Sequence, residues 1–528
     1  MVSTNEDSKI RKFIHHRQIN IIITTLLIFV STYIALVTCL GENIFNPIGN
    51  VTEPAWPTVN TRDVINSTIS TFFIVVFGLI AGRLCFLVHL PPLLGSLIIG
   101  IALKNIPGVN EWLIILPSWD AVLRKLAFAL IMIRCSMGIN LAVVRANPRI
   151  LVSLGCIAPL VEALCIFVAA HFIFSFPVSL SLVFGFLLAA NSPAVTVPSM
   201  LHFQNTNHGT AKGIPTLVLA CASADNVLLI VAYTVSIGLV FASGSLFATI
   251  AYTIGEIVAS AAIGIFLGWL LWYFPRKKDT YTHLARGIVL VTLSLALLFS
   301  AIRLDIEFTG SISLVAMCLT AAIRWKTNSE KQTRLEQRVY AVLWDLIFQP
   351  VLFVLIGMKF EISELSWHGI LIGLACLGIG LVGRAIAVIL LTVGAGLTMS
   401  EQLIFVFSFV PKATVQAALA PGIVVAAAAF PELLPQASIV LSACVVAILL
   451  TAPLGQLALG LFGPKFLTQD TKGFWPDDET TNPGRVLRER RGTWAGAAAA
   501  EEEQFFLHLA KPPQQPSEDL RDEGAATG

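Results

Sequence analysis

The sequence predicts an all-α, polytopic membrane protein with about 14 transmembrane helices, since about 20 apolar residues suffice to cross a bilayer and long apolar runs recur along the chain. Of the 528 residues, 56% are hydrophobic and only 12% are charged. A soluble globular chain carries roughly 25% charged residues, so half of the usual charge is missing. Two of the apolar runs also contain proline beside polar residues, at matching places in the two halves of the chain.

Composition excludes several classes of protein. The net charge is +2, and the chain has no basic stripe that would neutralise the phosphates of a nucleic acid. The nine cysteines all fall inside apolar runs, so we expect no disulfide framework. The nine histidines form no visible metal-binding or nucleophile arrangement. We therefore expect neither an enzyme nor a bound cofactor or metal.

Hydropathy places the expected spans, in chain order, near 19–40, 69–86, 91–103, 121–144, 150–176, 179–201, 214–240, 246–274, 287–302, 311–323, 339–360, 367–391, 403–424 and 439–462. Segments 91–103 and 311–323 are short for a span, and we expect them to be discontinuous or buried in protein. The polar segments 1–18 and 464–528 are expected to be tails, the second one mostly disordered, with Pro-rich and mixed-charge stretches.

Lysine and arginine in the short loops predict the orientation. One side of the predicted membrane collects most of them: Lys9, Arg11, Lys12, Arg17, Arg145, Arg149, Lys212, Arg276, Lys277, Lys278, Arg324, Lys326, Lys331, Arg334 and Arg338. The other side has little beyond Arg62, Arg303 and Lys359. An even number of spans with both termini in the cytoplasm explains this bias. The plasma membrane is the expected location, with an organelle membrane as the alternative.

The first loop on the outside, residues 41–68, contains two sequons for N-glycosylation. Asn50 begins Asn-Val-Thr, and Asn66 begins Asn-Ser-Thr. Asn50 is the better acceptor, because Asn66 lies close to the next expected span. The sequence therefore predicts a glycoprotein, with Asn50 and Asn66 as the candidates.

The run from Ile214 to Val240 carries Asp225 and Asn226 at its centre. An acidic group at bilayer depth costs on the order of 3 kcal/mol even on lenient insertion scales, so it usually faces a water-filled cavity or a buried partner. Asp225 is thus a candidate for taking a proton or pairing with a cation; the alternative is a structural hydrogen bond between helices. Asn226 has a carbonyl oxygen to offer as a ligand but cannot titrate.

Two spans are predicted to be broken helices. The first contains Asn191, Ser192, Pro193 and Thr196, with Pro198 following, and the second contains Pro411, Lys412 and Thr414. Proline removes a backbone donor and clashes with the preceding turn, so neither run is expected to be an uninterrupted helix. Interrupted segments at corresponding positions in two halves indicate a transport site built from inverted repeats. Ordinary proline kinks are the alternative.

Buried charges repeat with the same spacing. Glu162 precedes Asn191 by 29 residues, and Arg384 precedes Lys412 by 28. We predict two inverted repeats of six spans, residues 69–240 and 287–463, joined by a linker helix in 241–286 and preceded by an extra helix at 19–40. Glu162 and Arg384 are expected to form an ion pair, because an unpaired charge in lipid has a high free-energy cost. Lys412 is a candidate partner of Asp225 and proton carrier, or a structural neutraliser of helix dipoles.

Four stretches carry a family resemblance: NSPAVTVPSMLHF (Asn191–Phe203), GIPTLVLACASADNVL (Gly213–Leu228), WDLIFQPVLFVLIG (Trp344–Gly357) and VPKATVQAA (Val410–Ala418). They resemble the animal NHA branch of the monovalent cation/proton antiporters, the sodium/hydrogen exchangers of solute carrier family 9 subfamily B. TAPLG from Thr451 to Gly455 is similar to that branch too, and the similarity covers residues 93–465.

The resemblance implies an NhaA-like antiporter fold, a homodimer, a six-helix core that moves against a dimerisation domain, and a role in sodium and proton transport and pH homeostasis. It implies an ion site at the two crossing broken helices, with Glu162 and Arg384 matching a buried pair and Lys412 a crossing-helix lysine. The branch has two adjacent aspartates where this chain has Asp225 and Asn226. The second aspartate, its main carrier, is replaced by Asn226.

These observations predict a secondary-active antiporter that exchanges a monovalent cation (Na⁺, Li⁺ or K⁺) for H⁺ by alternating access, with Asp225 as the titrating group. Because Asn226 removes one negative charge, a proton-coupled chloride transporter or an uncoupled leak on the same fold is an alternative. A second alternative is a regulatory membrane subunit that keeps the fold and transports nothing.

Overall fold

The computed structural model describes residues 17–39, 61–88, 90–109, 113, 115–241, 246–275, 282–304, 306–328, 330–361, 367–428 and 430–470. Within these ranges every regular element is a helix, and one isolated β-bridge joins His208 to Gln469. Residues 1–476 form one compact unit. Residues 477–528, a second unit, lie outside the described residues.

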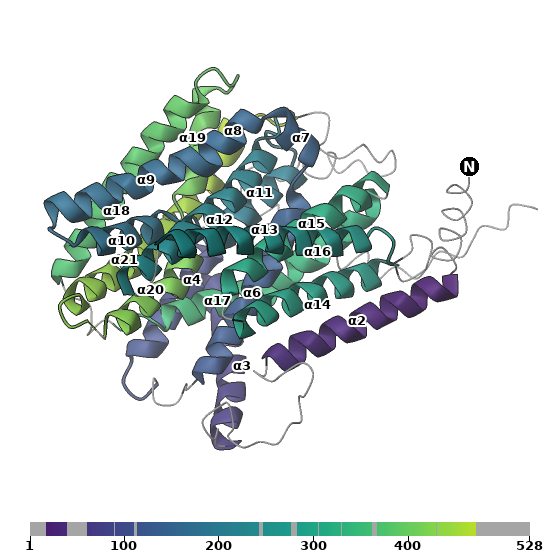
Figure 1. Ribbon diagram of the computed structural model, residues 1–528, viewed down its shortest axis with the longest axis horizontal. Helices are drawn as coiled ribbons and strands as arrows, with labels where there is room; N and C mark the ends of the chain where they lie inside the picture. The colour runs from purple at the N-terminus through teal and green to yellow at the C-terminus, as the bar shows by residue number, and fades with distance from the viewer. Residues whose placement is uncertain are drawn as a thin grey trace, which may run out of the picture. The chain divides into compact units, whose positions relative to one another are not determined.

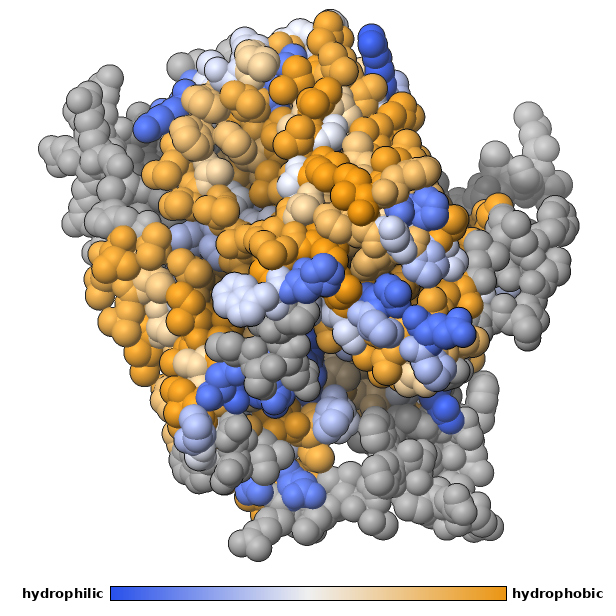
Figure 2. Space-filling model, turned by 90° about the vertical axis from the view of Figure 1, so that its left-hand side faces the viewer, coloured by the Kyte–Doolittle hydropathy of each residue, from blue (hydrophilic) through white to orange (hydrophobic). Residues whose placement is uncertain are grey.

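Eleven of the described helices, some of them in two pieces, are long and apolar enough to cross a membrane. Two shorter apolar helices, Pro92–Asn105 and Gly310–Trp325, accompany them. Large apolar side chains such as Phe29, Phe72 and Phe172 are exposed on helix surfaces, and apolar residues cover most of the face in Figure 2. Such a surface suits lipid rather than water. The expected all-helical, multi-span membrane protein is confirmed.

The first group of helices, here called the core group, contains both broken segments (Figure 1). Its members pack against one another: α8 (Pro148–Val152), η1 (Ser153–Ile157), α9 (Ala158–Val168), η2 (Ala169–Ile173), α10 (Val178–Ala189), α11 (Pro193–Asn205), α12 (Ile214–Phe241), α18 (Trp367–Thr392), α19 (Met399–Phe409), α20 (Thr414–Ala427) and α21 (Leu434–Phe466). Buried residues from α9, α10, α12, α18, α20 and α21 form one continuous apolar cluster.

The remaining helices, here called the panel group, pack mainly among themselves. They are α2 (Arg17–Cys39), α3 (Thr61–Leu87), α4 (Pro92–Asn105), α6 (Pro117–Gly138), α13 (Leu246–Leu270), α14 (Thr282–Arg303), α15 (Glu307–Asn328), α16 (Glu330–Leu343), η3 (Trp344–Phe348) and α17 (Gln349–Gly357). The short α7 (Leu141–Ala146) lies at the end of the loop after α6. A second apolar cluster joins the two groups through α6, α11, α12 and α17.

The short helix α4 is continuous and is packed against both α3 and α17. Gly100 on α4 and Gly357 on α17 face each other: a Cβ on Gly100 would collide with the carbonyl oxygen of Val354, and one on Gly357 with that of Leu97. The two backbones therefore approach as closely as only glycine permits. Because neighbouring protein covers the backbone of α4, a helix this short is accommodated.

Helix ends differ from the hydropathy-based expectations in two places that bear on function. Helix α3 begins at Thr61, so Asn66 lies inside a helix and not in the expected loop 41–68. The adjacent Ser67 is fully buried and its hydroxyl accepts a hydrogen bond from the backbone N–H of Leu116. Asn66 is therefore a poor glycosylation acceptor; Asn50 lies outside the described residues. Helix α6 ends at Gly138 instead of Val144, because Asn140 caps the separate helix α7.

Candidate functional site

The two broken segments meet where each loses its helical hydrogen bonds. Helix α10 ends at Ala189 and α11 begins at Pro193, a position that tolerates proline because its N–H would be unpaired in any case. Helix α19 ends at Phe409 and α20 begins at Thr414. The backbone N–H of Ser192 donates to the carbonyl oxygen of Pro411 at 2.8 Å, which joins one break directly to the other.

Side chains strengthen this crossing. The hydroxyl of Thr196 donates to the carbonyl oxygen of Ser408 at 2.8 Å, and the backbone N–H of Lys412 donates to the hydroxyl of Thr451 on α21 at 2.8 Å. Asn191 Oδ1 accepts from the backbone N–H of Ser192 at 2.8 Å. Unwound backbone is costly in a membrane unless protein covers it, and here each of these bonds satisfies a group that the break exposes.

The last carbonyls of α10 accept hydrogen bonds from side chains of the second broken segment and of α18. Lys412 Nζ donates to Ala189 O at 2.7 Å, and Arg384 Nη1 reaches the same oxygen at 3.2 Å. Gln416 Nε2 donates to the carbonyl oxygens of Leu187 and Ala190 at 3.0 and 2.7 Å. A helix C-terminus carries partial negative charge and unpaired carbonyls, which cations and amide donors stabilise.

Four fully buried charges form a continuous cluster beside the crossing. Arg384 on α18 donates through Nη1 to Glu162 Oε2 at 2.8 Å and through Nη2 to Asp225 Oδ2 at 2.6 Å. Lys412 Nζ lies 2.8 Å from Glu162 Oε1. Each of the four side chains is at most 3% exposed. Two carboxylates and two cations balance, so the cluster is neutral when all four are ionised.

This geometry corrects one expected partnership. Lys412 pairs with Glu162, and Asp225 pairs with Arg384. The reason is the crossing itself: Lys412 stands in the break between α19 and α20 and points at the end of α10, while Arg384 comes from the continuous helix α18 and spans the gap between α9 and α12. The guanidinium has several donors in one plane and can bind two carboxylates at once. It also lies 4.5 Å from the centre of the Phe409 ring.

Asn226 follows Asp225 on α12 and is 7% exposed. Its Nδ2 donates to Ala222 O at 2.9 Å, one turn earlier, and its Oδ1 has no hydrogen-bond partner. Asp225 Oδ1 is likewise buried without a partner. Other unsatisfied polar atoms in the broken segments are Asn191 Nδ2, Ser192 Oγ, Thr414 Oγ1 and Gln416 Oε1. The site thus retains oxygen ligands of the kind that alkali cations use.

Sequence reasoning did not single out Gln416 and Thr451, although both belong to the motifs quoted above. Gln416 lies four residues after Lys412, in the first turn of α20, and it is a polar residue in an apolar run directly after the predicted break, which is the signal that would have found it. Thr451 gives no such signal, because only the packing of α21 against the break brings it to Lys412. No group of three or more His, Cys, Asp or Glu within the described ranges is arranged to hold a metal ion.

Comparison with known proteins decides the family. The model of the family described as "Sodium/hydrogen exchanger, transmembrane" matches residues 69–462. This chain belongs to the sodium/hydrogen exchanger family. Its members are transporters, so the chain is a transporter and not an enzyme, as the sequence predicts.

Relatives and structures agree with this assignment. The chain is 32% identical to human sodium/hydrogen exchanger 9B1 over 422 residues, 78% of this chain and 81% of that protein. It is 35% identical to sodium/hydrogen exchanger 9B2 of Xenopus tropicalis over 408 residues, 74% of this chain and 75% of that protein. The resemblance to this subfamily is confirmed.

A solved structure gives the fold. The sodium proton antiporter MjNhaP1 from Methanocaldococcus jannaschii at pH 8 superposes on this exchanger-family chain with a TM-score of 0.59 at 17% identity. The match covers 76% of this chain and 99% of MjNhaP1. At this identity the likeness concerns the fold alone, which is that of a membrane antiporter.

Proposed function

We propose that this exchanger-family protein exchanges a monovalent cation (Na⁺, Li⁺ or K⁺) for H⁺ by alternating access, with Asp225 as the titrating, cation-binding carboxylate. The observation that carries the proposal is the neutral, fully buried cluster of Asp225, Arg384, Glu162 and Lys412 beside two crossing broken helices. Asp225 Oδ1 has no hydrogen-bond partner, so one oxygen of this carboxylate is available to a proton or a cation.

Charge balance couples the two ions. A cation that joins the neutral cluster adds one buried positive charge, and an uncompensated buried charge is strongly destabilising. The balance is restored when one proton leaves. Arg384 stays protonated in proteins, and an ionised Asp225 has no proton to give, so the fully ionised cluster loses its proton from the ammonium of Lys412. When Asp225 is protonated, the cluster carries one net positive charge, and a cation that replaces this proton leaves the net charge unchanged. Arg384 remains on Glu162 in either case and keeps that carboxylate paired while the cation is bound.

The finer architecture that we propose has 14 spans in two inverted repeats of six. The first repeat would comprise α3, α4, α6, α8–η2, α10–α11 and α12, and the second α14, α15, α16–α17, α18, α19–α20 and α21. Helix α13 would link them, and α2 would be the additional span. In support, the last three members of each repeat make up the core group, and each repeat contributes one break.

Movement of the core group against the panel group would carry the site across the membrane, in a homodimer held by the panel group. Both termini would face the cytoplasm, because the basic loop residues lie on that side. The plasma membrane and a role in pH homeostasis belong to the same proposal, as does a glycan at Asn50.

The second candidate is a protein that keeps the exchanger fold but has lost cation exchange. Such a protein moves chloride together with protons, or it transports no ion. Two observations favour it: the neighbour of Asp225 is Asn226, which cannot titrate, and Arg384 already occupies Asp225 Oδ2 at 2.6 Å. The cluster then has no carboxylate free of a cationic partner.

Proton flux in proteoliposomes loaded with a pH-sensitive dye separates the two. The protein and Asn226→Asp are each challenged with Na⁺, Li⁺ and K⁺ gradients, and separately with chloride gradients. Cation-driven proton movement by the unmodified protein supports the first function. Activity that appears only in Asn226→Asp means that exchange was lost with the aspartate. A response to chloride alone establishes the anion transporter.

A further inference from the structure

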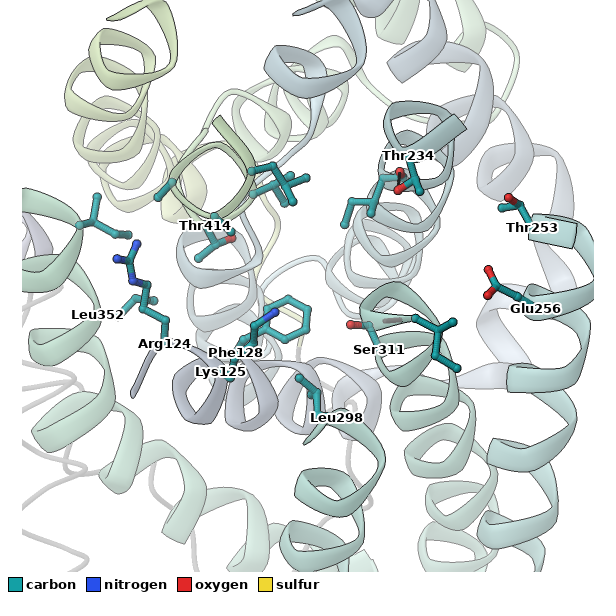
Figure 3. Close-up of a pocket in the computed structure, with 17 residues that line it drawn as sticks. Arg124, Lys125, Phe128, Thr234, Thr253, Glu256, Leu298, Ser311, Leu352 and Thr414 are labelled. Atoms are coloured by element: carbon teal, nitrogen blue, oxygen red, sulfur yellow. Dashed lines mark hydrogen bonds between the residues drawn. The ribbon is translucent and has the colours of Figure 1, made fainter. Parts of the chain in front are cut away.

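A cavity of about 360 Å³ lies between the core group and the panel group. Its core-group wall comes from α12 and from the first turns of α20, beginning at Thr414, two residues after Lys412. Its other wall comes from α6, α13, α14, α15 and α17 of the panel group. Figure 3 shows this arrangement, with Thr414 and Thr234 on core helices facing side chains of the panel group.

The lining residues share one end of the bundle. On α13 and α15 they come from the first half of the helix, on α6 from its first half and its middle, and on α12 from the second half, beyond Asp225. In the proposed 14-span arrangement successive spans run in opposite directions, which places these halves at the same end. The cavity therefore reaches from that end toward the break at Thr414, whose hydroxyl is buried and has no hydrogen-bond partner.

Glu256 on α13 contributes a carboxylate to this cavity. It is the acidic residue among the lining residues, and Figure 3 shows its carboxylate extending from α13 on the same side as Thr253. Its Oε1 is buried without a hydrogen-bond partner. Tyr252 hydrogen-bonds to the same side chain. Glu256 lies inside an apolar helix that is a candidate membrane span, where an acidic group is expected to face a cavity or a partner.

The surroundings of Glu256 suit a cation. Thr234 on α12, Thr253 on α13 and Ser311 on α15 line the same part of the cavity in Figure 3 and offer hydroxyl oxygens. The basic residues Arg124 and Lys125 lie on the opposite side, on α6. Arg124 Nε donates to Asp120 at 3.0 Å, and Lys359 Nζ lies 2.9 Å from the same carboxylate. The negative end of the cavity is thus at Glu256.

We propose that Glu256 forms a second, outer binding site for the transported monovalent cation, which gathers the ion in the cavity before it passes to Asp225. The inference rests on the proposed cation exchange. A carboxylate in a cleft with low-dielectric walls focuses its field and raises the local concentration of counter-ions by tenfold or more. Glu256 belongs to the panel group and stays in place when the core group moves, so it supplies ions to the site without travelling with them.

The test measures the cation dependence of proton flux in proteoliposomes for the full-length protein and for Glu256→Gln. We expect the cation concentration for half-maximal flux to rise about three- to tenfold, with the maximal rate within about twofold of the unmodified protein, since the charge acts on ion supply. Glu256→Asp keeps the charge and is expected to restore most of the affinity. Glu361→Gln is the matched control, because Glu361 pairs with Lys104 outside the cavity.

A second variant guards against poor folding of Glu256→Gln. Ser311→Lys places an ammonium in the cavity opposite Glu256 and is expected to raise the half-maximal concentration similarly, while Ser311→Gln changes size without charge. If Glu256→Gln and Ser311→Lys both leave the half-maximal concentration unchanged while the protein still exchanges cations, the outer site is wrong and the proposed function stands.

Thermal unfolding of the purified protein separates the two failures. Na⁺, Li⁺ and K⁺ are titrated against N-methylglucamine at constant ionic strength, and the concentration for half-maximal stabilisation is expected to be higher for Glu256→Gln. If the unmodified protein shows no cation-driven flux, the proposed function fails. The outer site is then overturned as well when no cation stabilises the protein or when Glu256→Gln leaves the stabilisation unchanged.

Discussion

At the scale of single residues, each buried charge of the site is paired with a charge of opposite sign. Asp225, Glu162, Arg384 and Lys412 come from four different helical segments and share their partners in a chain: Asp225 with Arg384, Arg384 with Glu162, and Glu162 with Lys412. Removing any one member leaves a neighbour with fewer partners in a place where water does not compensate. Transport and stability are therefore linked at these positions.

Asp225→Asn is expected to abolish cation-driven proton flux, because the carboxamide neither titrates nor balances a bound cation. Arg384 keeps Glu162 as a partner, so the protein is expected to fold. Proteoliposome flux gives the activity, and size-exclusion chromatography in detergent gives the folded fraction. Full activity in this variant would exclude Asp225 as the carrier.

Glu162→Gln removes one negative charge from a cluster of two carboxylates and two cations. Breaking a buried ion pair by removing one partner costs about 3 to 5 kcal/mol, so we expect a strongly lowered unfolding temperature. Lys412→Met added to Glu162→Gln removes the orphaned ammonium and should recover part of the loss. Thermal unfolding of the two single variants and the double variant measures the coupling; purely additive losses would mean that the pair does not interact.

At the scale of elements, the breaks in the two helices are held by one backbone hydrogen bond, from Ser192 to Pro411, and by side chains. Three donors reach the end of α10: Lys412 and Gln416 from the second broken segment, and Arg384 from α18. Lys412 and Arg384 take part in the charge cluster. Gln416 is uncharged, and its Nε2 hydrogen bonds tie the end of α10 to the beginning of α20, so that the two breaks hold a fixed relative position.

Gln416→Met keeps the volume of the side chain and removes these hydrogen bonds. We expect a loss of about 1 to 3 kcal/mol in stability, because the buried carbonyls of α10 lose a partner, and a lower maximal rate of flux. Gln416→Glu adds a buried negative charge and should be worse than Gln416→Met in thermal unfolding. An unaltered rate and unfolding temperature in Gln416→Met would show that the breaks keep their position without this residue.

Gly100→Ala tests the close contact of α4 and α17. The added methyl group meets the carbonyl oxygen of Val354, and overpacking of this kind costs about 1 to 3 kcal/mol. Gly378→Ala on α18 is the matched control, since its added Cβ has nothing within 4 Å. We expect a lower unfolding temperature for Gly100→Ala only. Equal unfolding temperatures would indicate that α4 moves aside.

At the scale of the whole molecule, the core group is tied at one end to the segment that follows α21. Gly209 N donates to Thr468 O and Asp470 N to Asn207 O, which makes a short paired segment. Asp470 Oδ2 accepts hydrogen bonds from the Thr210 hydroxyl at 2.9 Å and from the backbone N–H of Ala211 at 2.6 Å. The segment that directly follows α21 is therefore held against the loop between α11 and α12.

The pH dependence of this contact follows from His208. Burial lowers the pKa of His208 below its usual range, against the opposing effects of its hydrogen bond to Thr206 and of the nearby Asp470; His202 is the other titratable group beside it. The unfolded segment then binds the proton more readily, so the contact is complete above the ordinary histidine pKa of about 6.5 and weakens as the pH falls below that value.

Hydrogen exchange of residues 206–213 and 467–470 measures this effect. We expect faster exchange, corrected for the intrinsic rate, at a pH below the ordinary histidine pKa than above it. In His208→Gln the difference should be lost, and in Asp470→Asn protection should be low at both pH values. Equal protection of the unmodified protein at both pH values would contradict the argument.

Hydropathy and the composition of the runs determined the all-helical, multi-span fold class and both breaks, because the need to satisfy backbone groups in lipid leaves a chain few choices. The motifs determined the family. The polar residues of the site were also visible, since Asp225, Glu162, Arg384 and Lys412 are conspicuous in apolar surroundings. The linear pattern contained only part of their pairing. It predicts the Glu162–Arg384 pair, which the structure shows. It makes Lys412 a candidate partner of Asp225 or a neutraliser of helix dipoles, and in the structure Lys412 binds Glu162 and the last carbonyl of α10.

Pairing depends on which side chains reach across the crossing, and that is set by the packing of α9, α12 and α18 around the break. The same holds for Thr451, whose hydroxyl reaches Lys412 only because α21 packs there, and for Glu256, which in sequence is one charge in an apolar helix. Its place beside a cavity is decided by the contact between the core and panel groups. The charged residues of the site can be identified from the sequence, whereas their partners depend on the tertiary structure, because the cost of burying a charge depends on what lies within a few ångströms of it.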